Sequence, residues 1–306
     1  MNNNSKDIER KVGEIEGRAR ILSGWQLKFV AVVAFTWSLF QLWYASPLPY
    51  IVGFGVFIDV PARAIHLGFA LFIAFLAFPF VKKDRDKKIT LISFILSILG
   101  LVCTLYIFIN YEPLVYRNGI LLNLPFEIFN NIINFPIELI IGAIGIILLL
   151  EATRRAIGIP LVVVASVFLI YSIFGQSMPE LISHQGLSLK RLVGYHWFGG
   201  EAIFGIPISV SVSFVFLFVL FGSMLDYAGG GRYFLSLAIA LVGKFRGGPA
   251  KAAILASGLT GMISGSSIAN VVTTGTFTIP IMKKTGFPAT KAGAIEVAAS
   301  VNGQIM

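Results

Sequence analysis

The sequence is poor in charged residues and almost free of cysteine. Asp, Glu, Lys and Arg together make up 13% of the chain, about half of the roughly 25% found in globular domains. Too few charges are present to cover a water-exposed surface, which excludes a soluble enzyme and a disordered chain. The single cysteine, Cys103, lies in an apolar run, so a secreted scaffold held by internal disulfides is excluded as well. The three histidines lack the spacing of metal ligands.

Apolar residues dominate what remains. Hydrophobic residues make up 56% of the chain, 27 residues are Phe, and the mean hydropathy is +0.84. This composition predicts an all-α polytopic membrane protein, because a lipid-embedded backbone must form its hydrogen bonds within helices. The short apolar pieces between residues 112 and 134 predict interfacial helices instead of a crossing. The expected spans cover about residues 25–44, 64–81, 89–109, 135–150, 157–174 and 202–225.

The positive charges predict the orientation of the chain. Its formal net charge is +9, and Lys and Arg gather in short blocks between the apolar runs. Such blocks occur in residues 1–24, in 82–88 and at 154–155, whereas the alternate loops at 45–63 and 110–134 carry one each. By the positive-inside rule, we expect a multi-pass protein of the cytoplasmic (inner) membrane with a cytoplasmic N-terminus. The charges form no continuous stripe, so no nucleic-acid partner is expected.

The segment from 248 to 283 differs from the spans before it. Two small-residue apolar runs, 250–263 and 268–282, would form helices of about 21 and 22 Å. The sequence Ser-Gly-Ser-Ser at 264–267 separates them, and lysines flank both outer ends. Each run is shorter than the roughly 30 Å hydrocarbon core. The pattern therefore predicts a re-entrant helical hairpin with its tip near mid-membrane.

A hairpin tip of this kind is suited to binding ions. Broken helices leave carbonyls and amides unpaired, and Ser266 or Ser267 could cap the second helix and offer a hydroxyl. Ser267, Asn270, Thr274 and Thr278 follow at helical spacing, which predicts one polar stripe facing protein or an aqueous path. Neutral oxygens without a carboxylate suit Na⁺ better than Ca²⁺ or Mg²⁺. The alternative is that these small residues only allow close helix packing.

Several motifs resemble a known transporter family. Residues 244–250, 261–270, 279–282 and 298–306 resemble the large, twelve-span, DctM-like membrane subunit of tripartite ATP-independent periplasmic (TRAP) transporters. Upstream, residues 66–71 and 150–155 resemble the small four-span subunit fused ahead of it. The fused form is similar to permeases whose extracytoplasmic partner is of the TAXI type.

The resemblance implies a function. It implies Na⁺-coupled symport of organic anions (carboxylates) by an elevator mechanism, with an extracytoplasmic, TAXI-type substrate-binding protein that delivers the substrate. Na⁺ would be the coupling ion, with no other cofactor, and the protein would not be an enzyme. The implied ion and substrate site comprises Ser264, Gly265, Ser266, Ser267, Asn270, Thr274, Ser300, Asn302 and Gly303. Within it, Na⁺ would lie at Ser264, Ser267, Asn270 and Asn302.

The resemblance also implies a domain organisation. A cytoplasmic segment (1–24) would precede a small-subunit-like membrane domain (25–155) and the first part of a large-subunit-like transport domain (156–306). In the transport domain, a surface helix (232–246) and the re-entrant hairpin (248–283) would precede a truncated helix (289–306). The family motif continues beyond Met306, so we expect either a fragment of a longer chain or a truncated gene.

Two other classes of function are open to a chain of this composition. The first is a non-transporting membrane scaffold or a channel, which would need a continuous pore through intact helices. The second is an intramembrane serine hydrolase, which needs a nucleophile held by a base. The residues before Ser264 and Gly265 are Met262 and Ile263, so the Gly-x-Ser-Gly of rhomboid-type proteases is absent. Transport agrees best with the interrupted hairpin.

Overall fold

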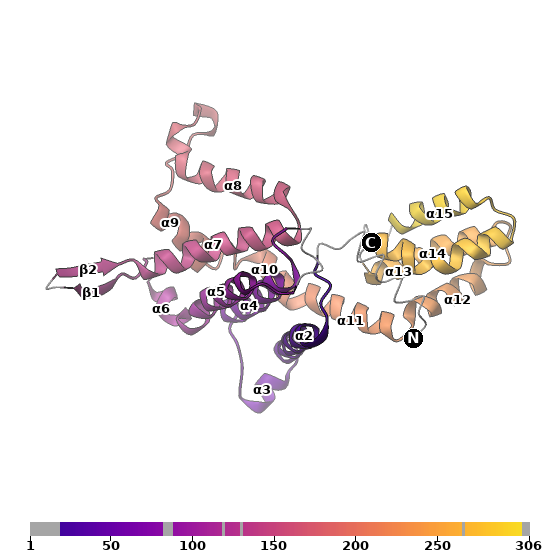
Figure 1. The fold of residues 1–306 in the computed structure, drawn as a ribbon, viewed down its shortest axis with the longest axis horizontal. Helices are drawn as coiled ribbons and strands as arrows, with labels where there is room; N and C mark the ends of the chain where they lie inside the picture. The colour runs from indigo at the N-terminus through magenta and orange to yellow at the C-terminus, as the bar shows by residue number, and fades with distance from the viewer. Residues whose placement is uncertain (1–18, 82–87, 118–119, 129–130, 265–266, 302–306) are drawn as a thin grey trace. The chain divides into compact units, whose positions relative to one another are not determined.

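The computed structural model describes residues 19–81, 88–117, 120–128, 131–264 and 267–301. These residues are helical almost throughout, which confirms the predicted class of an all-α polytopic membrane protein (Figure 1). Five of the helices described are long and apolar enough to cross a membrane, and they cover Gly24–Ala45, Asp59–Ala77, Leu91–Ile109, Ile159–Ser177 and Ile206–Leu225. The helices form two compact units, one over Arg18–Phe214 and one from Val215 onward.

The described part of the first unit contains five long helices and several short ones. The long helices are α2 (Gly24–Ala45), α4 (Asp59–Ala77), α5 (Leu91–Ile109), α7 (Ile137–Ala156) and α8 (Ile159–Phe174). The short ones are α3 (Leu48–Val52), α6 (Tyr111–Tyr116), α9 (Leu189–Val193) and α10 (Ile206–Val210). A π-turn at Gly194–Phe198 follows α9. Helices α4 and α5 pack along each other, and Leu71 and Phe75 of α4 are buried with Cys103 of α5.

The expectation of interfacial helices between 112 and 134 is only half correct. Helix α6 is present, but β1 (Leu124–Ile128) and β2 (Asn131–Phe135) form an antiparallel hairpin in which Leu124 faces Phe135. Pro125 cannot supply a helical amide, and the isoleucines and phenylalanines here favour extended backbone. These local preferences explain the hairpin.

The first unit is packed around aromatic side chains set against glycines. Trp197 of the π-turn is fully buried, and its ring lies edge-on to that of Phe204 with centroids 5.7 Å apart. A Cβ placed on Gly145 of α7 would lie 2.3 Å from the Trp197 ring. Only glycine leaves room for this indole, so α7 and the π-turn approach each other closely.

The boundary between the compact units differs from the domain boundary expected from family resemblance. The resemblance separates residues 25–155 from 156–306, whereas the packing separates the chain between 214 and 215. Trp197 and Phe204 join the core formed by α4, α5 and α7, which explains why the segment after residue 155 folds with the first unit. Packing does not test whether residues 25–155 are related to the small subunit, so that assignment stays a prediction.

The second unit has a core of small residues. Its helices are α11 (Phe216–Tyr227), α12 (Gly230–Val242), α13 (Gly248–Ser264), α14 (Ser267–Lys284) and α15 (Ala289–Val301). Gly229, with φ of 93°, separates α11 from α12 in a backbone conformation that favours glycine. Ala238 of α12 packs against Ala252 and Ala256 of α13. Because alanines form this contact, the helix axes can lie close together.

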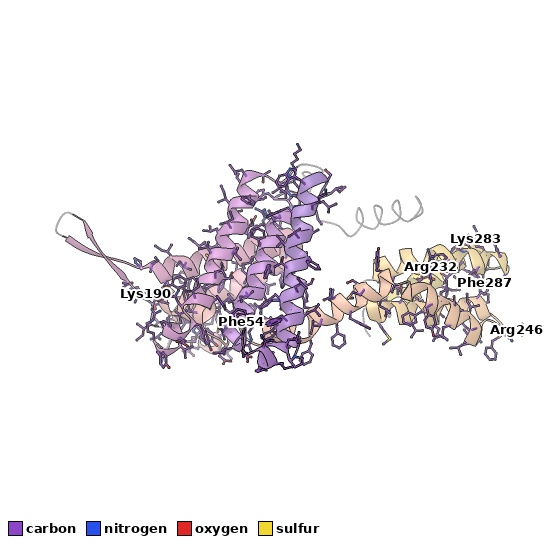
Figure 2. The ribbon with its side chains drawn as sticks, turned by 90° about the horizontal axis from the view of Figure 1, so that it is seen from below. Phe54, Lys190, Arg232, Arg246, Lys283 and Phe287 are labelled. Atoms are coloured by element: carbon purple, nitrogen blue, oxygen red, sulfur yellow. The ribbon has the colours of Figure 1, made fainter. Side chains whose placement is uncertain are left out.

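Helices α13 and α14 form the expected helical hairpin. Ala253 near the start of α13 packs with Met282 near the end of α14, so the two helices are antiparallel. Lys251 and Lys283 therefore belong to the same end of the hairpin, and both are exposed. Lys283 is labelled in Figure 2. The arms have 17 and 18 residues, about 26 and 27 Å, longer than expected because the helices continue into the flanking Gly and Lys residues. The depth of the hairpin in a membrane stays a prediction.

Candidate cation site

A cluster of buried polar side chains lies between α13, α14 and α15. Each of its members is at most 5% exposed: Ser257, Thr260, Asn270, Thr274, Thr278, Glu296 and Ser300. The surrounding core is made of alanines and other apolar side chains. Burying so many polar groups is costly unless they bind one another or a ligand. We refer to these seven residues as the polar cluster.

Helical spacing places the members of the polar cluster on facing sides of their helices. Asn270, Thr274 and Thr278 recur every four residues on α14, and Glu296 and Ser300 are four residues apart on α15. Residues at this spacing lie one above the other on a single helix face. Each helix therefore has one polar face, and the two faces meet where Thr274 and Thr278 of α14 contact Glu296 of α15.

One half of the polar cluster links all three helices through an amide and two hydroxyls. Asn270 Nδ2 donates to Ser257 O at 2.7 Å and to Ser257 Oγ at 3.0 Å. Ser257 Oγ lies 3.0 Å from Ser300 Oγ. This chain of contacts connects α14 to α13 and α13 to α15.

The other half is built on a buried carboxylate. Glu296 is 0% exposed, and Thr278 Oγ1 donates to its Oε2 at 2.6 Å, while Thr274 Oγ1 contacts its Oε1. A Cβ on Gly275 would lie 3.2 Å from Glu296 Cγ, so α14 leaves space for this side chain. Among the residues that the structure describes, no Lys, Arg or His forms an ion pair with Glu296.

The structure places several of the predicted site residues in this cluster. The polar stripe is confirmed for Asn270, Thr274 and Thr278, which face protein, and Ser300 joins them from α15. Ser267 is the first residue of α14 and is half-buried. Ser264 is the last residue of α13, and Gly265, Ser266, Asn302 and Gly303 lie outside the described residues. Their role in Na⁺ binding stays a prediction.

Sequence reasoning missed Glu296 and Ser257. The stripe on α14 was followed along one helix and the facing helix was not considered, so the carboxylate of Glu296 beside Thr274 and Thr278 was not expected. A signal was present, since Glu296 is the only acidic residue between 227 and 306. An ionisable residue within an apolar membrane segment is a candidate functional residue by default.

Another buried carboxylate, in the first unit, is held in a different way. Glu138 of α7 is 0% exposed and accepts from Arg117 at 2.7 and 2.8 Å, from Tyr106 at 2.9 Å and from the backbone of Leu122. The hydrogen bond to Glu138 raises the pKa of Arg117, so the guanidinium keeps its positive charge. Its geometry anchors the segment after α6 to the start of α7.

Two further features bear on the choice of site. No group of three or more His, Cys, Asp or Glu side chains that could hold a metal ion occurs among the described residues. A cavity of about 870 Å³ in the first unit is lined in part by Lys190, Arg191, Tyr195 and Glu201. It lacks the buried hydroxyls and amide of the polar cluster, which is therefore the stronger candidate for binding a bare cation.

Comparison with known proteins gives the family. Residues 144–306, just over half of the chain, match the family described as "Tripartite ATP-independent periplasmic transporter, DctM component". The chain belongs to this family. All three helices of the polar cluster lie within the matched residues. Membership and the apolar helices together make the chain a multi-pass membrane protein of a transporter family.

Individual relatives agree with the DctM assignment. The chain is 31% identical over 55% of its length to the uncharacterized protein YgiK of Salmonella typhimurium, of which the match covers 34%. It is 38% identical over 23% of its length to the C4-dicarboxylate TRAP transporter large permease protein DctM of Rhodobacter capsulatus, covering 16% of that protein. A putative TRAP transporter large permease protein of Haemophilus influenzae is 32% identical over 26% of the chain, which covers 19% of that relative.

The matches therefore span about a third or less of these relatives' lengths. No solved structure matches the chain.

Proposed function

We propose that the complete protein is the membrane component of a Na⁺-coupled secondary transporter that imports organic anions, and that the polar cluster belongs to its coupling-ion site. The observation that carries the proposal is the meeting of oxygens from α13, α14 and α15 beside a hairpin whose arms are separate helices. Interrupted helices that end beside buried oxygens are typical of binding sites in secondary transporters. Membership of the DctM family supports transport over hydrolysis.

The donors in the polar cluster suit a small monovalent cation. Hydroxyl, amide and backbone oxygens supply partial negative charge, and Glu296 adds one carboxylate. One carboxylate among neutral oxygens balances one positive charge, whereas the Ca²⁺ loops of proteins use several carboxylates. We place Ser264, Ser267, Asn270 and Asn302 at the same Na⁺ site, with Thr274, Ser300 and the turn between the arms beside it.

The substrate and partner follow from the family and from one named relative. The Rhodobacter capsulatus relative is a C4-dicarboxylate transporter by its name, which supports carboxylates as the substrate class. An extracytoplasmic binding protein, of the TAXI type, would deliver the substrate to a permease in the cytoplasmic membrane with its N-terminus inside. Residues 25–155 would act as a fused small subunit, and the hairpin would move in an elevator mechanism.

Binding of Na⁺ to the purified complete protein tests the coupling-ion site. A ligand that binds only the folded state raises the melting temperature, so NaCl should raise it relative to choline chloride, and ²²Na⁺ should bind directly. We expect Asn270→Ala to weaken ²²Na⁺ binding at least about tenfold, which equals about 1.4 kcal/mol for a lost contact.

A control substitution is available on the same hairpin. Thr285 is exposed, and its hydroxyl donates to carbonyls at the end of its own helix, Ile281 O and Met282 O. Thr285→Val should keep wild-type Na⁺ binding. In proteoliposomes supplied with the binding protein, uptake of a labelled carboxylate should require Na⁺. Absence of ²²Na⁺ binding, or uptake unchanged when choline replaces Na⁺, would refute the proposed function.

A further inference from the structure

Arginines gather at one end of the first unit, where α4 and α7 end and α5 begins. Arg155, in the last turn of α7, donates through Nη1 to Ser93 Oγ at 3.3 Å. Arg20 donates through Nη2 to the same oxygen at 3.2 Å, and its backbone N–H donates to the carbonyl of Ala77, the last residue of α4. Both arginines and Ser93 are buried. One hydroxyl on α5 therefore holds two guanidinium groups close together.

The charges in this part of the sequence do not balance. Arg155 Nε pairs with Glu151 at 2.7 Å, and Arg154 Nε pairs with the same carboxylate at 2.7 Å. Between α4 and α5, residues 82–88 carry five basic and two acidic side chains, and residues 1–18 carry four of each. Whatever pairs form among these groups, positive charge remains in excess. An excess of cations at a partly buried site favours the binding of an anion.

Arg154 is the member of this group that a ligand can reach, because its side chain is 29% exposed. Its Nε and Nη2 donate to Glu151, and Nη2 also donates to Phe80 O. Within the described part of the chain, Nη1 donates to no other residue. The guanidinium lies over the ring of Phe80, with Cζ 4.5 Å from the centroid, which restrains its plane. A planar, restrained guanidinium with a spare donor is well suited to phosphate oxygens.

Exposed apolar side chains belong to the same end of these helices. Phe80 and Val81 follow α4, Leu91 and Ile92 begin α5, and all four are exposed. Both helices are long and apolar enough to cross a membrane, so their ends lie at the depth of the lipid headgroups when they span it. Apolar side chains next to cations match a ligand that joins a phosphate to acyl chains. A free phosphate ion gains nothing from them.

We propose that Arg154, with Arg155 and Arg20 close by, binds a phosphate group, and that the carrier of this group is an anionic phospholipid. Arg154 contacts the phosphate oxygens, while Arg155 and Arg20 add positive potential. Basic pockets between membrane helices on the cytoplasmic side bind lipid headgroups in this way, and the charge pattern predicts that this end is cytoplasmic. The inference goes beyond the proposed function and does not depend on the Na⁺ site.

Lipid binding to the complete protein in a neutral detergent tests the site. Dioleoyl phosphatidylglycerol should raise the melting temperature, because a ligand that binds only the folded state stabilises it. Dioleoylglycerol has the same acyl chains without the phosphate and should not raise it at the same mole fraction. Native mass spectrometry should show the bound phospholipid directly.

Free phosphate is distinguished from lipid in a separate arm of the same assay. Potassium phosphate should raise the melting temperature less than phosphatidylglycerol does, when compared with potassium chloride at equal ionic strength. An equal or larger rise with phosphate would support the phosphate site and overturn the phospholipid as its carrier.

Substitutions assign the binding to Arg154. Arg154→Gln leaves Glu151 paired with Arg155, and the affinity for phosphatidylglycerol should fall at least about tenfold with the loss of a charged contact. Arg246 is exposed in the second unit. Arg246→Gln removes the same charge and should change the affinity by no more than about twofold, because salt screens a lone exposed charge. If Arg154→Gln does not fold, Arg154→Lys keeps the charge but loses the planar fork, and it should weaken binding about threefold.

Two results would refute the site. Phosphatidylglycerol and dioleoylglycerol would act alike if the arginines only held the helix ends together. Equal losses of affinity in Arg154→Gln and Arg246→Gln would mean that net charge alone attracts the lipid.

Discussion

Glu138 and Glu296 are both completely buried, yet the two units of the molecule hold them in opposite ways. Glu138 is paired with Arg117 and also accepts from Tyr106, so its charge is fixed by a cation. Glu296 contacts the hydroxyls of Thr274 and Thr278. Removing the charge of Glu138 breaks an ion pair, whereas removing that of Glu296 does not. The first arrangement suits a fixed anchor, whereas the second joins α14 to α15 through neutral hydroxyl donors.

The cores of the two units also differ, because large side chains interlock in the first and small ones form the helix contacts in the second. The first unit encloses Trp197 and Phe204 against α7, where Gly145 leaves no space to spare. In the second unit, alanines such as Ala252 and Ala256 form the contact between helices. Large interlocking side chains resist displacement, while flat alanine faces hold helices together with less steric interlocking.

Removing the cation beside Glu138 should have the largest effect on stability. Arg117→Ala leaves a buried carboxylate without its partner, which we expect to cost about 3 kcal/mol, at the lower end of the range for broken buried pairs because the Arg117 side chain is itself 24% exposed. Chemical unfolding in mixed micelles measures the change. Arg191 is exposed, and Arg191→Ala should change stability by no more than about 0.5 kcal/mol. Equal effects of the two substitutions would refute the role of the pair.

Adding a methyl group at Gly145 should have the second largest effect on stability. In Gly145→Ala the new methyl would lie 2.3 Å from the Trp197 ring, and the resulting overpacking should cost about 2 kcal/mol. Nothing lies within 4 Å of a Cβ on Gly258 in α13. Gly258→Ala should therefore leave stability unchanged or raise it by up to about 1 kcal/mol. Thermal unfolding followed by far-UV circular dichroism distinguishes these outcomes, because the helices of both units contribute to that signal. A destabilised Gly258→Ala would contradict the difference between the cores.

Loss of one hydroxyl beside Glu296 should have a smaller effect. Thr278→Val keeps the shape of the side chain but removes the donor to Glu296 Oε2, at an expected cost of about 1 kcal/mol. Thr278→Ser should recover most of this loss because it restores the donor. Unfolding midpoints in the same micelles provide the measurement. A valine variant as stable as the serine variant would show that the contact contributes nothing.

The smallest change in stability is expected for Glu296→Gln. Comparing it with Glu138→Gln tests directly whether the two glutamates are held in different ways. Gln has nearly the same shape as Glu and can still accept from Thr278, and this substitution breaks no ion pair, so we expect a change within about 0.5 kcal/mol. Glu138→Gln should cost about 2 kcal/mol because Arg117 loses a charged hydrogen-bond partner. Measuring both variants by the same unfolding assay checks the prediction. The reverse order would contradict the difference drawn between the two glutamates.

Much of the fold could be predicted because it depends on local composition. The runs around residues 25–44, 89–109 and 157–174 correspond closely to α2, α5 and α8. Composition was a poorer guide between 112 and 134, where the hairpin of β1 and β2 replaced an expected helix. Short apolar pieces carry too few residues for periodicity to separate strand from helix.

The sequence by itself determined the class of membrane protein, the break between the two arms at 264–267 and the polar face of α14. Each of these depends on residues close together in the chain, through hydropathy or through the repeat of the helix. Tertiary structure alone decided that α15 brings Glu296 to Thr274 and Thr278, and that Trp197 lies against Gly145. Helical periodicity defines a face but not its neighbour, because the choice of neighbour depends on packing summed over the whole unit.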